Sequence, residues 1–204
     1  MKTKTLTIIS LSFIVTMGSI IQSQSAQPTF GSDLNFLKKY NMVIVLSDAD
    51  GKSQVAVVPA YQGRVMTSTA RGEKGISFGW VNRKLISTRK FQQHMNAFGG
   101  EDRFWLGPEG GQYSIFFKKN DPFDLDHWFT PAAIDTESFD VVRFNPSSVL
   151  FRKDIALTNY SGTTFNLEVQ REVRLSNPEI LLRKFGVEPP KGVATTGYES
   201  VNTV

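Results

Sequence analysis

The residues best suited to chemistry lie in one short segment, "FGGEDRFWLGPEGG", at residues 98–111. Glu101, Asp102 and Arg103 place two carboxylates beside a guanidinium. Arginine offers several fixed N–H donors to sugar hydroxyls or to a uronate carboxylate, and a neighbouring acid accepts hydrogen bonds from other hydroxyls. Glycines bend the chain on both sides, so these charges are held in place and are not a solvated run. The segment predicts a carbohydrate-type binding site.

Tryptophan, histidine and a further acid extend this candidate site. An indole can stack on the apolar face of a sugar, although an aromatic residue in a β-sandwich belongs more often to the core. A histidine can contact a ligand or merely hold a loop, and an acid in a turn is commonly solvated. The candidate substrate-binding residues are Glu101, Asp102, Arg103, Trp105, Glu109, His127 and Trp128.

A purely structural interpretation of the same charges stays open. An arginine–carboxylate pair would pin the "FGGEDRFW" loop without binding a ligand. The two interpretations are compatible, since one residue can be a clasp while its neighbour meets a sugar.

Metal and cofactor sites are not expected. Asp121, Asp124 and Asp126 lie close together in "NDPFDLD", but this segment lacks the glycine and closing glutamate of a calcium-binding helix–loop–helix. The two histidines are far apart and the chain has no cysteine, which argues against zinc. The segment "GEKG" is too short to cradle a phosphate.

The first 26 residues have the order of a secretory signal. Lys2 and Lys4 precede an apolar run from Leu6 to Ile21, and small and polar residues follow. Thr and Ser interrupt the run, so a retained anchor is the weaker alternative. We expect residues 1–26 to be a signal peptide and the mature chain to be periplasmic or extracellular, without membrane association.

Net charge gives no reason to expect nucleic-acid binding. The formal charge of +4 falls to about +2 when Lys2 and Lys4 leave with the signal. With 40% hydrophobic residues, the 204-residue chain can build one core.

Short strands and turns dominate the rest of the chain. The segments 41–46 and 53–58 predict a hairpin around "SDADGK". Apolar and polar residues alternate over 149–157 and 163–175, and "NYSG" at 159–162 joins them into a second hairpin. One helix is expected from Asn177 and Pro178 to Gly186, and another from Ser32 or Asp33 through residue 40. The fold class is all-β, an antiparallel β-sandwich with one or two short helices.

Four segments carry a family resemblance: "GWVNR", "FGGEDRFWLGPEGGQYSIFF", "HWFTPAAIDTESF" and "GYESVNT". Together they resemble a secreted bacterial family of unknown function that is similar to the galactose mutarotase-like superfamily. The resemblance covers about residues 33–204. It implies a β-supersandwich with a sugar-binding face, and a full member about twice this length. Residues 27–204 are therefore expected to be the N-terminal part of such a domain.

The resemblance does not carry a mutarotase activity onto named residues. That reaction needs a carboxylate base and an acid, usually histidine. His94 and His127 lie outside the histidine motif of the true galactose mutarotases, and the usual base would fall beyond this chain. We expect an exported protein that binds or acts on a hexose or uronate. The alternative is a non-catalytic β-sandwich that binds another protein.

Overall fold

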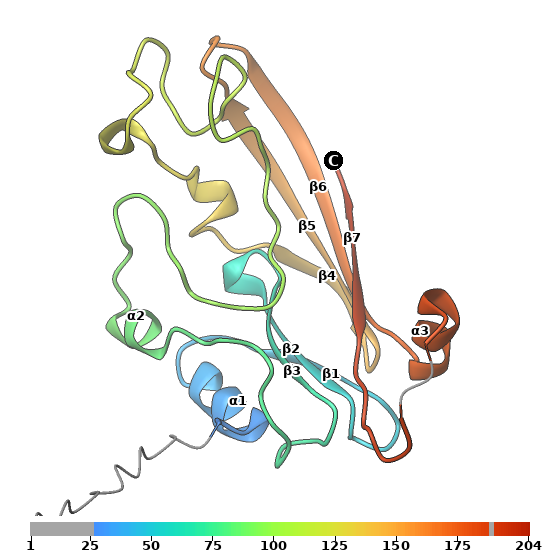
Figure 1. Ribbon diagram of the computed structural model, residues 1–204. Coiled ribbons are helices and arrows are strands. Elements are labelled where there is room, and N and C mark those ends of the chain that lie inside the picture. The colour runs from blue at the N-terminus through green and yellow to red at the C-terminus, as the bar shows by residue number, and fades with distance from the viewer. Residues whose placement is uncertain (1–26, 188–189) are drawn as a thin grey trace, which may run out of the picture.

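The computed structural model describes residues 27–187 and 190–204 of the chain, so the expected signal peptide lies outside the described residues (Figure 1). Two antiparallel sheets dominate the structure. The three-stranded sheet has the order β1 (Ile44–Ser47), β2 (Gln54–Val58) and β3 (Arg64–Thr69). The four-stranded sheet has the order β4 (Asp140–Asn145), β5 (Ser148–Thr158), β6 (Thr164–Leu175) and β7 (Tyr198–Thr203). The predicted mostly-β class is confirmed.

The second predicted hairpin is the longest regular feature of the described chain. β5 and β6 pair without interruption from Ser148–Arg174 to Thr158–Thr164. The "NYSG" turn is confirmed, because the Gly162 amide donates to the Asn159 carbonyl at 2.8 Å. Alternate residues of β6 are buried, but Phe165 at the turn end is 41% exposed. The first predicted hairpin is also confirmed, as β1 and β2.

Helices are more numerous than expected. The described residues contain α1 (Phe30–Lys38), α2 (Arg83–Thr88) and α3 (Pro178–Phe185), with the 3₁₀ turns η1 (Pro59–Tyr61), η2 (Leu125–His127) and η3 (Ala132–Ile134). The helix expected at Pro178 is confirmed. None of the helices in the described part of the chain is long and apolar enough to cross a bilayer.

The expected start of the first helix, Ser32 or Asp33, was wrong by two or three residues. Thr29 is its N-cap, and its hydroxyl accepts from the Ser32 amide at 3.2 Å. Asp33 is buried instead, where it pairs with Arg83 at 2.7 Å. The second helix, α2, was not predicted; the Asn82 side chain caps it by accepting from the Leu85 amide.

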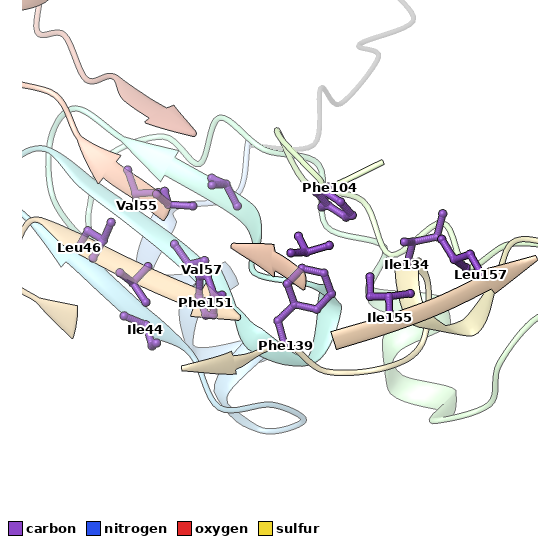
Figure 2. Packing of buried hydrophobic residues seen from close by; sticks show 14 of the residues in the cluster. Ile44, Leu46, Val55, Val57, Phe104, Ile134, Phe139, Phe151, Ile155 and Leu157 are labelled. Carbon is purple, nitrogen blue, oxygen red and sulfur yellow. The ribbon is translucent and has the colours of Figure 1, made fainter. Parts of the chain in front are cut away.

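The largest apolar cluster draws side chains from both sheets. Figure 2 shows Leu46, Val55 and Val57 of the three-stranded sheet near Phe151 of β5. Loops between α2 and β4 lie along the four-stranded sheet in Figure 1 and add Phe104, Phe116 and Ile134 to the cluster. A second cluster lies between the three-stranded sheet and the helices α1 and α2. The three-stranded sheet is therefore covered on both faces.

Candidate functional site

The charged segment lies against the outer edge of β3. Gly99 and Gly100 have φ values of 92° and 108°, which side-chain-bearing residues rarely adopt. A Cβ on Gly99 would lie 2.1 Å from the Trp80 carbonyl oxygen, so the position has no room for one. After this bend, Asp102 forms a β-bridge with Val65. The expected turn before the three charges is confirmed.

The three consecutive charges then diverge. Glu101 contacts Ser68, Asp102 contacts Arg171, and Arg103 contacts Asp135. These partners come from β3, from β6 and from the turn after η3. The three side chains therefore do not line one shared site.

Asp102 joins the two sheets through a buried arginine. The Arg171 side chain is 0% exposed, and its Nη2 pairs with the Asp102 carboxylate. Its Nε donates to the Gly63 carbonyl at 3.0 Å, and its Nη1 donates to Asn202 Oδ1 at 2.9 Å. A fully buried guanidinium needs such partners, since an unpaired buried charge is strongly destabilising. The Asp102 carboxylate is therefore engaged in a structural ion pair with Arg171.

Arg103 forms the clasp that the sequence left open as an alternative. Its Nη2 donates to the Ile134 carbonyl at 2.9 Å and lies 3.6 Å from Asp135 Oδ1. The Asp135 carboxylate also accepts from the side chain of buried Asn96 at 2.7 Å. Burial lowers the pKa of Arg103, and Asp135 opposes this shift. The clasp ties three loop segments together.

The Glu101 side chain accepts a hydrogen bond from the outer edge of β3, where a neighbouring strand would otherwise pair. Its carboxylate accepts from the Ser68 amide at 2.7 Å and from the Ser68 hydroxyl at 2.9 and 3.0 Å. Tyr198, the first residue of β7, also makes a side-chain hydrogen bond to it. Unlike the other two charged residues, Glu101 is exposed and forms no ion pair with a cation within the described part of the chain.

The surroundings of Glu101 favour its protonated form. Partial desolvation of the carboxylate raises its pKa, and Asp102 adds to this effect, whereas the bonds from Ser68 and Tyr198 oppose it. Desolvation and the two nearby carboxylates likewise raise the pKa of Tyr198. Glu101 and Tyr198 therefore place a carboxyl group and a hydroxyl group side by side. Each can donate or accept a hydrogen bond with a ligand, according to its protonation.

A row of exposed apolar side chains flanks Glu101. Ile76, Phe78 and Trp80 are 56%, 55% and 63% exposed, while the intervening Ser77 and Gly79 are buried. The Phe78 amide donates to the Ser68 carbonyl at 3.0 Å. Ser68 is therefore hydrogen-bonded both to Glu101 and to the segment that carries the exposed row.

The row projects from the same face as Ser68. Thr67 Oγ1 lies 2.6 Å from Ser77 Oγ, which places these two on one face and their neighbours Ser68 and Phe78 on the other. A hollow of about 230 Å³ adjoins the row, lined by Ile76, Phe78 and Val193 among others. We call Ser68, Phe78, Trp80, Glu101 and Tyr198 the Glu101 site.

The remaining predicted residues lie elsewhere. Trp105 Nε1 donates to Glu109 Oε1 at 2.9 Å, and the Arg103 guanidinium lies 4.0 Å from the centroid of the Trp105 ring. Trp128 stacks on buried Phe116 with centroids 5.2 Å apart, which is a core contact. These tryptophans are not placed beside Glu101 by any contact described here.

His127 is the last residue of η2 and pairs with Asp124, the N-cap of that turn. Its Nδ1 lies 2.5 Å from Asp124 Oδ1, with both side chains substantially exposed. This contact raises the pKa of His127 and lowers that of Asp124. Over the described residues, no group of three His, Asp or Glu side chains is arranged to hold a metal ion.

Sequence reasoning missed Ser68, Phe78, Trp80, Arg171 and Tyr198. Three of these had a local signal. Arg171 occupies an inward position in the alternation of β6, between Val169 and Val173. Alternation in "ISFGW" also marks the exposed row, although there the apolar residues face outward. Ser68 and Tyr198 had no such signal, since their roles arise from contacts between distant segments.

The chain belongs to a family described as "Family of unknown function (DUF6786)", whose match covers residues 28–204. No curated protein and no solved structure matches the chain.

Proposed function

We propose that this member of the DUF6786 family is an exported carbohydrate-binding protein of galactose mutarotase-like type, and that its sugar contacts are made at the Glu101 site. The observation that supports this most is the exposed Glu101 carboxylate, held by Ser68 and Tyr198 beside exposed aromatic residues. The proposed export rests on the lysine-flanked apolar run at residues 1–26.

The chemistry of the Glu101 site suits a sugar. A carboxylate accepts hydrogen bonds from adjacent hydroxyls, and the Tyr198 hydroxyl can donate or accept. Ser68 is 3% exposed, so its hydroxyl holds Glu101 and does not itself face the ligand. Phe78 and Trp80 supply flat apolar surfaces for the C–H face of a pyranose ring. A neutral hexose can donate hydroxyl hydrogen bonds to Glu101, whereas the carboxylate of a uronate would be repelled by the ionised form of this side chain.

The fold is compatible with the proposed superfamily. Two antiparallel sheets contribute to one apolar cluster, as a β-sandwich requires. The finer assignment to a β-supersandwich rests on the four sequence segments that resemble that superfamily.

Binding is proposed in preference to a defined reaction. A raised carboxyl pKa suits proton transfer, but mutarotation also needs a second acid–base group near the sugar. Both histidines make their described contacts elsewhere: His127 with Asp124, and His94 with the Trp128 carbonyl. We assign no catalytic residue.

The test is a calorimetric titration of the purified protein with galactose, glucose, galacturonate and glucuronate. Glu101→Gln and Trp80→Ala should each weaken binding of the best ligand by about tenfold, because one replaces a carboxyl oxygen with an amide and the other removes the stacking surface. Glu109→Gln and Phe144→Ala are matched controls, since Phe144 is 66% exposed on β4. Equal losses from the controls would contradict the assigned site.

A protein-binding role is favoured instead by one feature, the exposed apolar row. Three neighbouring apolar side chains in solvent are a common mark of a protein interface. Failure of all four sugars to bind, together with reversible self-association that Trp80→Ala removes, would favour this alternative.

A further inference from the structure

A second hollow lies between α2 and η1, away from the Glu101 site. Its volume is about 310 Å³. The walls contain four aromatic rings and the rim two cations; these six residues are Tyr40, Tyr61, Phe91, Phe98, Arg89 and Lys90. We call this hollow the α2 pocket.

The floor of the α2 pocket is a preformed aromatic surface. Tyr61 stacks on Phe98 with ring centroids 3.9 Å apart and planes inclined by 11°. Asn41 Nδ2 donates to the Tyr61 hydroxyl at 3.1 Å, which fixes that ring. Thr136 adds a hydroxyl to the lining. Tyr61 and Phe98 are only 7% and 3% exposed, so a ring-bearing ligand would meet the edge of a fixed, buried pair at the floor.

The charge of the α2 pocket is one-sided. Arg89 and Lys90 line it, and no Asp or Glu is among its lining residues. Neither cation forms an ion pair within the part of the chain that the structure describes. An anion entering the pocket would therefore meet two positive charges without displacing a carboxylate.

Arg89 has a left-handed backbone conformation, which is uncommon for an arginine. It follows α2 with φ at 53°, a left-handed position where glycine or asparagine is the common choice. Its guanidinium lies 5.4 Å from the centroid of the Tyr40 ring. The side chain is thus oriented along the aromatic wall.

Additional positive charge lies behind the floor. Arg64 is 2% exposed, and its Cζ lies 5.7 Å from the centroid of the Phe98 ring. Its Nε and Nη2 have no hydrogen-bond partner in the described structure. Burial, followed by nearby Arg103, lowers the pKa of Arg64 to about 10, so it stays charged at neutral pH.

The wall that carries Phe91 is anchored. The Gln92 amide donates to Asn96 Oδ1 at 2.7 Å, and Asn96 in turn donates to buried Asp135. Because Asp135 also contacts Arg103, the clasp supports this side of the pocket.

We propose that the α2 pocket binds a small anion that carries a ring, with the ring among the aromatic side chains of its lining and the anionic group near Arg89 and Lys90. The ring is either that of an aromatic carboxylate or that of an acidic sugar. This site is independent of the sugar site proposed around Glu101.

Two pairs of probes test the proposal on the ¹⁵N-labelled protein: benzoate with benzyl alcohol, and galacturonate with galactose. The two compounds of each pair have the same ring, but only the first carries a negative charge. At least one anion should shift the amide resonances of Phe91 and Thr136 and bind about tenfold more tightly than its neutral partner. Whether benzoate or galacturonate does so identifies the type of ring. Shifts confined to Ser68 and Tyr198 would instead report the Glu101 site.

Substitutions at the rim provide the second arm. Arg89→Gly keeps the left-handed backbone and removes one cation, so we expect about fivefold weaker anion binding with folding retained. Lys84→Gln is the matched control, because Lys84 is on α2 but lines a different hollow. The proposal is overturned if neither anion shifts Phe91 and Thr136, if neutral probes bind as tightly, or if Lys84→Gln weakens binding as much as Arg89→Gly.

Discussion

Glu101 and Asp102 are adjacent acids in very different surroundings. Asp102 pairs with a fully buried arginine and links the two sheets, whereas Glu101 is exposed and held by hydroxyl and amide donors. The difference follows from the bridge between Asp102 and Val65, which turns the Asp102 side chain toward β6 and leaves Glu101 at the strand edge. Two adjacent acids can therefore differ in burial and in partners within one peptide step.

The largest loss of stability is expected when Asp102, the acid paired with a buried arginine, is replaced. Asp102→Ala leaves the Arg171 guanidinium buried without its counter-charge, so the free energy of unfolding should fall by about 4 kcal/mol. Arg171→Met should be less damaging, because Asp102 is 29% exposed and can be hydrated. Urea denaturation of the three proteins measures both. A loss below about 1 kcal/mol for Asp102→Ala would contradict the inter-sheet role.

The second-largest loss of stability is expected at the clasp between Arg103 and Asp135. Arg103→Met leaves the Asp135 carboxylate, 4% exposed, with Asn96 as its remaining side-chain partner, and should lower the free energy of unfolding by about 3 kcal/mol. Lys153→Met is the matched control: Lys153 is also 23% exposed, but its partner Glu137 is 48% exposed. Denaturation should show a loss below about 1 kcal/mol for the control. Equal losses would mean that burial of the acid does not decide the effect.

At Glu101 we expect a smaller effect that depends on pH. Because the folded pKa is raised, the stability contributed by this carboxyl group is full below its unfolded pKa and is lost as pH rises through the folded value. Glu101→Gln should therefore gain stability relative to the unmodified protein as pH rises above about 4, the ordinary range of a glutamate pKa. Denaturation midpoints followed as a function of pH measure the difference. A difference that stays constant with pH would refute the shifted carboxyl group.

The exposed pair His127–Asp124 should have the smallest influence on folding. Its stabilisation is present below the ordinary histidine pKa and disappears as pH rises through the raised pKa of His127. Asp124→Asn should move the His127 titration midpoint to lower pH, as followed by the ring resonances in NMR. An unchanged midpoint would exclude the hydrogen bond as the cause.

Local patterns were sufficient for two hairpins, but they did not predict β3, β4 or the partners of the site residues. The β5–β6 hairpin was predictable because alternating apolar residues and a four-residue turn define it within one continuous segment. α2 was missed because a six-residue helix has too few turns for a periodic signal. Glu101 was predicted as a site residue, but nothing near it in the sequence indicated that Ser68 and Tyr198 would hold it. Those contacts depend on how three distant segments meet at the edge of β3.

The most direct measurement compares Glu101→Gln with Asp102→Asn in both stability and sugar affinity. The account predicts that Glu101→Gln unfolds at the same denaturant concentration as the unmodified protein near pH 4 and binds the best hexose or uronate about tenfold more weakly. Asp102→Asn should be clearly destabilised, yet retain that affinity where it is still folded. The account is contradicted if Glu101→Gln binds the sugar unchanged, or if the two substitutions destabilise the protein equally.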